Sequence, residues 1–474
     1  MEVVGQLNVQ VKYGSQEEKL VLVVIGGSGP SLFGRNWLKY IRLEWRKIAS
    51  IRTTRSEAVN TLIKQHQQLF TDKLGTVMPY KAKLQVQPQA APRFFKPRQV
   101  PFAIRDAVGK ELDLLEKQRI IEKVSHSDWA APIVPVPKKD GRFRICGDYK
   151  VTVNQALAVE QYPLPRPEDL LATLAGGKCF TKLDFSQAYL QVPLDEESRA
   201  YVTINTHQGL YRYTRLPFGV ASAPALFQKL MDMVLQGITG VACYIDDILS
   251  STKDENKHLL TLGKVFRSLE EHGFRLKQEK CAFLTSSVEY LGHLIDPEGI
   301  HPLPSKVAAI AQAPAPTNLQ ELRSFLGLLN YYGKFIPNLS TTIYPLNELL
   351  QADRKWKWSQ ERAKAFELAK KHLTSSQLLT HYDPSLPIQM AADASSYGVG
   401  AVISHTFPDG TEKPIAFASR TLTMSERNYA QLEKEALALV FGVKKFHQYL
   451  YGWRFTLITR HSPPSWAPRR AYLR

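Results

Sequence analysis

The order of apolar and polar residues along the chain predicts a mixture of strands and amphipathic helices. Leu7, Val9 and Val11 alternate with polar residues and an apolar run follows at 20–25, so residues 1–48 are expected to be rich in strand. Apolar residues at helical spacing predict helices further along, at residues 58–70, 105–121, 223–235, 259–273, 318–329 and 425–450. Strand-like and helix-like segments alternate through 178–251, which favours a mixed α and β domain at the centre of the chain.

Two local signals refine this outline. Asn318 and Glu321 form a capping box, which fixes the start of the helix that follows them. Pro132, Pro135 and Pro137 interrupt an otherwise strand-like stretch. Because proline has no backbone N–H to donate, these residues favour edge strands and turns.

The most informative polar residues interrupt an apolar run at 241–249. Asp246 and Asp247 lie inside it, where a buried, unpaired carboxylate would cost several kcal/mol. A hairpin turn that presents both carboxylates to shared divalent cations would remove this cost. Asp184, at the end of the apolar segment 180–183, could supply a third carboxylate. Such a group suits two metal ions about 3.5–4 Å apart in a phosphoryl transfer, whereas the Asp pair taken alone would fit a polar surface turn.

Composition and charge narrow the class of partner. The chain has 474 residues, enough for about three domains, and its 44% hydrophobic and 22% charged residues are ordinary for a globular protein. A formal net charge of +17 favours a polyanionic partner, with nucleic acid ahead of an anionic membrane. Basic residues accompany aromatic ones at 94–98 and cluster at 138–144, a combination that suits phosphates and stacked bases.

Cysteine spacing and the lengths of apolar runs bear on the compartment. The four cysteines are far apart and form no CxxC pair, which argues against a zinc site or a disulfide scaffold and favours a reducing compartment. The early apolar run at 20–25 is too short to span a bilayer, and nothing resembles a secretory signal. We therefore expect an intracellular protein with no membrane partner.

Five segments, taken in order, resemble the reverse transcriptase region of gypsy-type LTR retrotransposon pol polyproteins. They are VPKKDGRFR at 136–144, LDFSQAY at 183–189, LPFG at 216–219, YIDD at 244–247 and EYLGH at 289–293. Each segment alone is a weak signal, but five in order at family spacing are specific. The resemblance implies an α+β, right-hand polymerase of fingers, palm and thumb. A β-rich retropepsin fragment would precede it and a truncated ribonuclease H-like α/β module would follow.

The resemblance assigns the three carboxylates to nucleotidyl transfer. Asp184, Asp246 and Asp247 would hold two Mg²⁺ ions, with Mn²⁺ as the alternative, to activate the primer 3′-hydroxyl and stabilise the leaving pyrophosphate. Because successive strand residues face opposite ways, only a turn lets both members of the Asp pair approach the metals. Asp246 is expected to be the firmer ligand of the two.

The resemblance also implies contacts to the incoming nucleotide. Lys138 or Lys139 would meet the triphosphate as a point charge, and Arg144 would meet it through a bidentate fork. A solvated basic hairpin is the alternative for this segment. Tyr189 matches the steric gate that excludes a ribose 2′-hydroxyl. Without the resemblance, the residue would be interpreted as an ordinary core or surface tyrosine. Phe218 would lie near the nucleotide and template.

Two further expectations concern the pyrophosphate and the primer. Lys280 corresponds to a lysine that would protonate pyrophosphate, and an exposed loop lysine is an equal alternative. Leu291, Gly292 and His293 would form the primer grip, in which glycine allows a close approach of one backbone to another.

From residue 389 onward the chain resembles the start of a ribonuclease H domain. Asp393 matches the first metal-binding acid. Glu435 is the expected second acid, because it falls on the apolar face of the predicted helix 425–450. That face is expected to contain Leu432, Ala436, Leu439, Val440 and Val443. The third acid is replaced, since the chain has Arg460 where the family has aspartate. A positive charge there would repel a metal ion, so we expect no ribonuclease H activity; a frameshift or a mispredicted exon would explain the change.

Residues 29–38 resemble the end of a retropepsin-like protease, whose catalytic aspartate segment is not in the sequence, so no protease activity is expected. The chain would then resemble an excerpt from a longer polyprotein. The expected domains are a protease fragment at 1–48, a linker at 49–93, fingers and palm at 94–298, thumb and connection at 299–385, and a truncated ribonuclease H-like domain at 386–474.

The leading hypothesis is an RNA-directed DNA polymerase. Its expected partners are an RNA template, a DNA primer, an RNA–DNA hybrid and deoxynucleoside triphosphates, and the family implies virus-like particles in the cytoplasm. The first rival is a non-catalytic retroelement relic that only binds nucleic acid. The second rival is a protein whose principal activity is cleavage of RNA–DNA hybrids.

Overall fold

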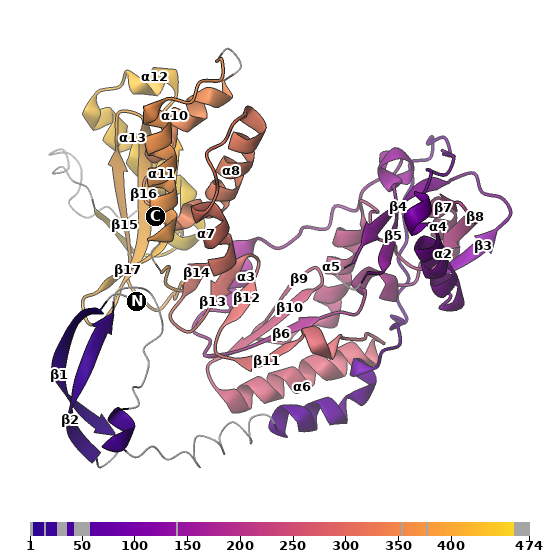
Figure 1. The fold of residues 1–474 in the computed structure, drawn as a ribbon, viewed down its shortest axis with the longest axis horizontal. Helices are drawn as coiled ribbons and strands as arrows, with labels where there is room; N and C mark the ends of the chain where they lie inside the picture. Colours follow the sequence, from indigo (N-terminus) through magenta and orange to yellow (C-terminus); the bar gives the residue numbers. More distant parts are fainter. Residues whose placement is uncertain are drawn as a thin grey trace. The chain divides into compact units, whose positions relative to one another are not determined.

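The computed structural model describes residues 3–13, 16–25, 36–41, 57–138, 141–351, 354–375 and 378–458. Lys139, Arg460 and most of the segment 29–38, all of which carry predictions, lie outside these residues. The chain divides into two units, residues 1–65 and 66–474 (Figure 1). No helix in the described ranges is long and apolar enough to cross a membrane.

The first unit contains an antiparallel hairpin of β1 (Val3–Tyr13) and β2 (Gln16–Ile25), as the alternating residues predicted. Leu20 is buried, whereas Leu7 remains exposed. The indole N–H of Trp37, in the short helix η1 (Trp37–Lys39), donates to the Val21 carbonyl over 2.8 Å. The assignment of this region to a protease stays a prediction.

In the second unit, a five-stranded sheet has the strand order β3-β8-β7-β4-β5 and packs against α2 (Figure 1). Its strands and nearby helices are β3 (Ile121–Val124), β4 (Ala131–Pro137), β5 (Phe143–Gly147), β7 (Thr203–Thr206), β8 (Gly209–Tyr213), α2 (Phe102–Lys117) and α4 (Glu196–Tyr201). α2 buries Val108, Leu112 and Leu115, which recur at helical spacing.

The prolines of β4 fit its place in this sheet. β4 pairs with β7 only through Ala131 and Pro132, and its remaining residues pair with β5 alone. Since an antiparallel ladder bonds through alternate residues, Pro135 and Pro137 can face the unpaired edge, where a missing N–H costs nothing. The edge strand predicted from these prolines is therefore present over the second half of β4.

A second, antiparallel sheet has the order β11-β6-β10-β9, and α6 runs along it (Figure 1). The elements of this region are α3 (Pro167–Thr173), β6 (Cys179–Asp184), α5 (Ala223–Val234), β9 (Val241–Tyr244), β10 (Asp247–Thr252), α6 (Glu255–Glu271) and β11 (Ala282–Thr285). The Asp254 carboxylate caps α6 by accepting the Lys257 N–H at 2.8 Å. The helix ends before Gly273, whose φ of +78° few other residues would tolerate.

The chain then forms a three-stranded sheet and a group of helices. They are β12 (Val288–Tyr290), β13 (His293–Ile295), β14 (Ile300–Pro302), α7 (Pro304–Ala311), α8 (Leu319–Tyr331), α9 (Leu339–Thr342), α10 (Tyr344–Asn347) and α11 (Gln360–Thr374). The Asn318 side chain accepts the Glu321 N–H at 2.9 Å and so begins α8, as predicted. Short 3₁₀ helices occur throughout the unit, at Gln67–Phe70 (η2), Tyr149–Val151 (η3), Val153–Gln155 (η4), Ala188–Gln191 (η5), Gln278–Lys280 (η6), Gly333–Phe335 (η7) and Glu348–Leu350 (η8).

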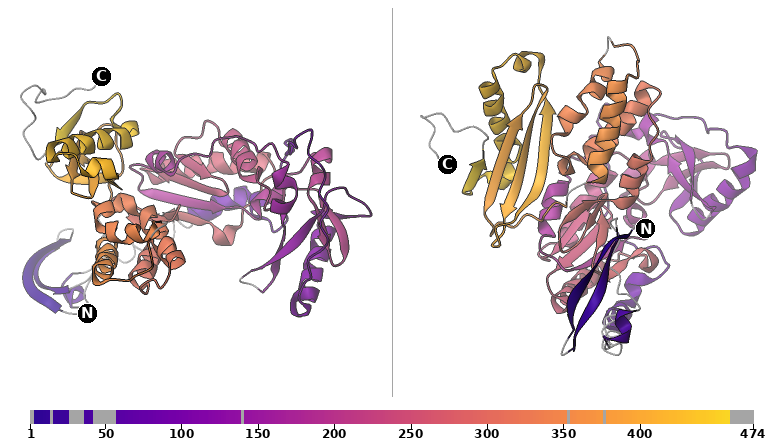
Figure 2. Two further views of the ribbon diagram at one scale, coloured as in Figure 1. Left: turned by 90° about the horizontal axis from the view of Figure 1, so that it is seen from above. Right: turned by 60° about the vertical axis from the view of Figure 1, so that its left-hand side comes forward.

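The last sheet has the order β17-β16-β15-β18, and α13 packs on β15 and β16 (Figure 2). Its elements are β15 (Ile388–Ala394), β16 (Gly398–Thr406), β17 (Glu412–Thr421), α12 (Met424–Arg427), α13 (Gln431–Lys445), α14 (His447–Leu450) and β18 (Phe455–Ile458). β15 and β18 are parallel, while the other two pairings are antiparallel.

The prediction of a single helix at 425–450 is wrong, because the structure has three helices in this segment, α12, α13 and α14. Glu426 closes a capping box with Thr423 and receives two hydrogen bonds from Arg420, at 2.7 and 2.8 Å, which fixes the short α12. Glu433 then accepts the Ala430 N–H at 2.8 Å and starts α13 as a separate helix. Two capping acids in one segment explain why apolar periodicity alone misses the break.

The apolar face predicted for this segment is also only partly correct. Leu432, Ala436 and Val440 are exposed, whereas Ala438 and Gly442 are buried against the sheet. A Cβ atom on Gly442 would lie 2.9 Å from the Met390 Sδ atom, so the helix approaches too closely for a larger residue. Close backbone approach, rather than side-chain size, decides which face turns inward.

Candidate active site

A tight turn between β9 and β10 carries the adjacent carboxylates. Tyr244 and Asp247 pair across the hairpin, which leaves Ile245 and Asp246 as the two turn residues. Ile245 has a φ of +55°, an unfavourable conformation for a β-branched residue that costs about 1–3 kcal/mol. The surrounding structure must therefore hold the turn.

Gln228, on the inward face of α5, supplies that support. Its Oε1 atom accepts the Ile245 N–H at 2.7 Å, and its Nε2 atom donates to the Cys243 carbonyl at 3.1 Å and to the Asp232 carboxylate at 2.8 Å. The side chain is fully buried, so these bonds have no competition from water. Sequence reasoning missed this residue, although an amide inside an apolar helix was a signal that could have found it.

The structure brings the three predicted carboxylates together. Asp184 ends β6 and lies directly opposite Asp247, the first residue of β10. Directly opposite residues in an antiparallel pair have Cβ atoms about 4.5–5.5 Å apart. Asp246 sits one residue earlier, in the turn, and the charges of Asp247 and Asp184 act on its carboxyl group, so the three aspartates lie at the same end of the sheet.

Two lysines neutralise this group of aspartates. The Lys182 Nζ atom lies 2.9 Å from Oδ1 of Asp247, and the Lys280 Nζ atom lies 3.0 Å from Oδ1 of Asp184. Asp246 has a different environment. Burial of its carboxyl group raises the pKa above the ordinary value, its own backbone N–H lowers it, and the charges of Asp247 and Asp184 raise it again. Burial is the largest of these effects, so the raised pKa of Asp246 reflects chiefly a carboxyl group removed from water.

The donor set fits a hard divalent cation, because carboxylate oxygens from two paired strands and their turn lie at the same end of the sheet. Among the described residues, however, no group of three His, Cys, Asp or Glu side chains is already arranged to coordinate a metal ion. The Lys182 and Lys280 ammonium groups each pair with one of the carboxylates.

An aromatic cluster adjoins the carboxylates. The Tyr189 ring lies 5.2 Å from that of Phe218 and 5.4 Å from that of Phe227, between ring centroids. Burial, the Asp246 charge and Tyr244 raise the pKa of Tyr189 to about 12, so its hydroxyl stays protonated. The Arg144 guanidinium sits 4.6 Å above the Phe218 ring as a cation–π pair. The structure thus places Tyr189, Phe218 and Arg144, three residues predicted to contact the nucleotide, next to one another.

The lysines predicted to contact the nucleotide or pyrophosphate differ in their contacts. Lys280 belongs to η6 and contacts Asp184 rather than lying free in a loop. Lys138 forms an ion pair with Glu111 of α2, with its Nζ atom 3.5 Å from the carboxylate. Lys139 lies outside the described residues.

Leu291, Gly292 and His293 form the end of a separate hairpin, between β12 and β13. Leu291 and Gly292 are the turn residues, and His293 is buried at the start of β13. Their expected role as a primer grip stays a prediction.

The two ribonuclease H-like acids lie on a neighbouring strand and helix of the last sheet. Asp393 lies in β15 and Glu435 in α13. Gln431 donates to the Ala394 carbonyl at 3.2 Å and to Glu435 at 3.4 Å, which ties the helix to the strand beside Asp393. The chain at Arg460 is outside the described residues.

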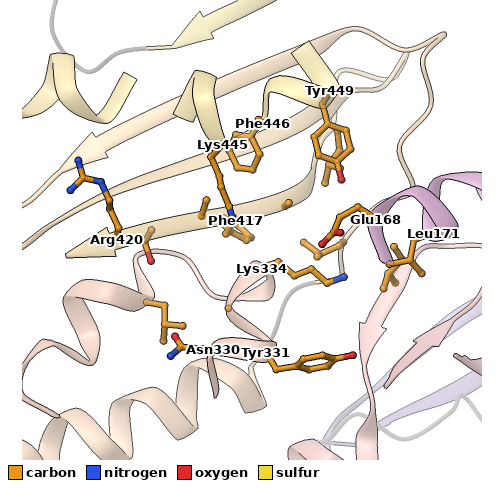
Figure 3. Close-up of a pocket in the computed structure, with 18 of the residues that line it drawn as sticks. Glu168, Leu171, Asn330, Tyr331, Lys334, Phe417, Arg420, Lys445, Phe446 and Tyr449 are labelled. Carbon is orange, nitrogen blue, oxygen red and sulfur yellow. The ribbon is translucent and has the colours of Figure 1, made fainter. Parts of the chain in front are cut away.

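A cavity of about 600 Å³ lies elsewhere, between α3, the end of α8, β17 and α13 (Figure 3). Lys334 points into it near Glu168. Burial lowers the pKa of Lys334 to about 8, against the opposing effect of Glu168. None of the three clustered aspartates lines this cavity, so it is distinct from the candidate active site.

Comparison with known proteins agrees with this geometry. The family described as "Reverse transcriptase (RNA-dependent DNA polymerase)" matches residues 136–295. The "Retrovirus-related Pol polyprotein from transposon 297" of Drosophila melanogaster is 35% identical over 381 residues, 78% of this chain. The corresponding protein from transposon opus of the same fly is 33% identical over 433 residues, 87% of this chain. Residues 136–295 are a reverse transcriptase domain, and the chain as a whole is similar to retrotransposon Pol polyproteins.

The match extends beyond the reverse transcriptase domain. The family "RNase H-like domain found in reverse transcriptase" matches residues 358–457, which begins before the expected boundary at 386 and includes α11. The chain covers 35% of the transposon 297 polyprotein and 43% of the opus polyprotein, so it corresponds to less than half of either relative. The domain boundaries expected from the sequence stay predictions.

A solved structure confirms the expected fold class. The structure titled "Structure of the foamy viral protease-reverse transcriptase in complex with dsDNA" superposes with a TM-score of 0.79 and 26% identity, covering 89% of each chain. The reverse transcriptase domain therefore has the right-hand polymerase fold, with a ribonuclease H-like module after it. Members of the family generally use divalent metals.

Proposed function

We propose that this reverse transcriptase domain extends a DNA primer on an RNA or DNA template, using deoxynucleoside triphosphates. The observation that carries the proposal is the meeting of Asp184, Asp246 and Asp247 at one end of the β6–β10 pair. A non-catalytic relic would have no need to keep a strained turn, its buried Gln228 support and three carboxylates in one place. Strong net positive charge supports a nucleic acid partner.

The proposed cofactor is a pair of Mg²⁺ ions held by the three aspartates. When bound, they would supply positive charge for the attacking and leaving oxygens. Lys182 and Lys280 partly balance the negative charge of the aspartates and lie close enough to share their carboxylates with the ions. Lys280, whose ammonium group contacts Asp184, is the proposed proton donor to the leaving group.

The nucleotide would lie against the Tyr189 and Phe218 rings. The cation–π contact with Phe218 holds the Arg144 guanidinium beside these rings, where its fork of N–H donors would meet phosphate oxygens. Tyr189 is wedged between Phe218 and Phe227, which makes it a rigid wall. A rigid ring at the sugar would favour a deoxyribose over a ribose by steric exclusion.

Primer extension tests the proposed function. The chain is mixed with a labelled DNA primer on an RNA template, deoxynucleotides and Mg²⁺, and product length is followed with time. We expect extension that requires both the template and the divalent cation. Folded protein that binds the primer–template, shown by a filter or anisotropy assay, but adds no nucleotide would instead favour the relic.

Arg144→Lys is expected to raise the KM for deoxynucleotides about tenfold, with a smaller change in kcat. Lysine keeps the charge but loses both the bidentate fork and the stacking on Phe218. Steady-state extension at varied nucleotide concentration measures the effect. Arg212→Lys is the matched control, because Arg212 lies in the same sheet but pairs with Glu122 at 2.7 Å. Equal KM values for the two variants would exclude Arg144 from the nucleotide site.

Cleavage of a labelled RNA–DNA hybrid by the same preparation is expected to stay at background. Arg460 places a positive charge where the family has its third acid, and it would repel a divalent cation. A known ribonuclease H added to the same hybrid shows that the substrate can be cut. Hybrid cleavage that disappears in Asp393→Asn would prove the module active and this prediction wrong.

A further inference from the structure

The turn between β12 and β13 is held in an unfavourable backbone conformation. Tyr290 and His293 pair across the hairpin, so Leu291 and Gly292 are its two turn residues. Their φ angles are +44° and +68°. Turns of this kind require positive φ at both positions and usually contain asparagine and glycine. Gly292 adopts the conformation freely, but Leu291 is strained because its Cβ atom approaches the next carbonyl oxygen.

Two consecutive tyrosines hold the carbonyl groups of this turn. The Tyr331 hydroxyl donates to the Leu291 carbonyl at 2.6 Å, and the Tyr332 hydroxyl donates to the Gly292 carbonyl at 2.8 Å. A Cβ atom placed on Gly292 would lie 3.0 Å from the Tyr331 oxygen. The tyrosine therefore packs directly over the glycine, and each carbonyl of the turn has its own phenol donor.

His293 completes the support from inside the hairpin. Its Nδ1 atom lies 2.6 Å from the Leu291 carbonyl oxygen and must carry the proton, since a carbonyl can only accept. The ring packs between Tyr331 and Phe335, at centroid distances of 5.5 and 5.7 Å. Burial is the main reason that the pKa of His293 falls to about 3, so the ring stays neutral and the contact does not change over physiological pH.

Tyr331 and Tyr332 connect the β12–β13 turn to α8, a helix that is packed into the core. Tyr331 is the last residue of α8 and Tyr332 caps it. On its other side α8 is fixed in the core by four buried residues, Leu322, Phe325, Leu326 and Leu329. Figure 3 shows Tyr331 projecting from the end of this helix at the edge of the cavity. A shift of α8 would therefore carry the turn with it.

We propose that Tyr331 and Tyr332 are positioning residues, which fix the Leu291–Gly292 turn so that the primer 3′ end meets the catalytic aspartates. The inference rests on the proposed polymerase function. A primer strand that lies against the turn would have its terminal hydroxyl displaced whenever the turn relaxes. Displacement of a reacting group by about 1 Å can reduce a rate a hundredfold without loss of binding.

The test is a comparison of Tyr331→Phe, Tyr332→Phe and the double variant with the parent chain. Phenylalanine keeps the ring packing and removes only the hydroxyl donor. Tyr344→Phe is the matched control, because its hydroxyl bonds to Glu348 at 2.8 Å, away from the turn. Single-turnover extension gives the chemical rate, the KM for nucleotide and the affinity for primer–template, and amide hydrogen exchange reports on residues 288–295.

The double variant is expected to extend the primer about tenfold more slowly, with an unchanged KM for nucleotide and faster exchange at the turn. Tyr344→Phe is expected to match the parent in each measurement. A parent-like rate in the double variant would overturn the inference and leave the polymerase function intact. A rate loss shared by Tyr344→Phe, with equal loss of thermal stability, would also overturn it. A parent chain that adds no nucleotide would refute the polymerase function, and the inference with it.

Discussion

Primer extension is expected to fall by a factor of at least about 10³ when Asp246 and Asp247 are both replaced by asparagine. The substitution keeps side-chain size and removes two negative charges from the turn. Several kcal/mol of transition-state stabilisation depend on cations that only carboxylates hold well. Burial and the neighbouring carboxylates already raise the pKa of Asp246, so a neutral amide there should leave the fold intact.

The measurement is single-turnover extension, with primer–template affinity and thermal unfolding measured on the same samples. Glu196→Gln combined with Glu197→Gln is the matched control, since it removes two adjacent negative charges from the exposed start of α4. The control should retain the parent rate. Residual extension of more than a few per cent by the Asp246 and Asp247 variant would mean that these carboxylates are not the metal-binding group.

Gln228→Leu is expected to lower the extension rate about a hundredfold and to reduce the free energy of unfolding by about 2–4 kcal/mol. Leucine fills a similar volume but leaves the Ile245 N–H and the Cys243 carbonyl without their partners. The strained turn then loses what holds it, and both aspartates move. Extension kinetics and chemical denaturation measure the two effects.

Two further variants separate the turn from general stability. Gln228→Glu keeps an acceptor for the Ile245 N–H and loses the donor to Cys243, so an intermediate rate is expected. Leu230→Ala, at another buried position of α5, should cost about 2–5 kcal/mol of stability. It should keep the parent rate well below its melting temperature. If Gln228→Leu behaves like Leu230→Ala in both measurements, the amide serves stability alone.

Much of the fold and of the site follows from local sequence. The helix predicted at 223–235 is observed as Ala223–Val234, and the glycine predicted to end another helix does so at Gly273. These elements are set by apolar spacing and by caps within a few residues. The three aspartates could be grouped for the same kind of reason, because each one interrupts or ends an apolar strand.

The parts that sequence could not supply depend on contacts between distant segments. Gln228 reaches the β9–β10 turn from a helix that ends seven residues before β9 begins, and no local pattern shows where its amide points. The pairing of Lys182 with Asp247 requires the register of two strands more than sixty residues apart. The inward face of α13 was mistaken because Gly442 approaches the sheet more closely than a leucine could.

The proline-bearing half of β4 also bears on solubility. An unpaired strand edge with exposed Val134 and Val136 would normally invite a strand from a second molecule. A strand from a second molecule would find no backbone N–H donor at Pro135 or Pro137. It could not form a continuous ladder of hydrogen bonds along this edge. Pro135 and Pro137 are therefore expected to oppose edge-to-edge aggregation of this five-stranded sheet.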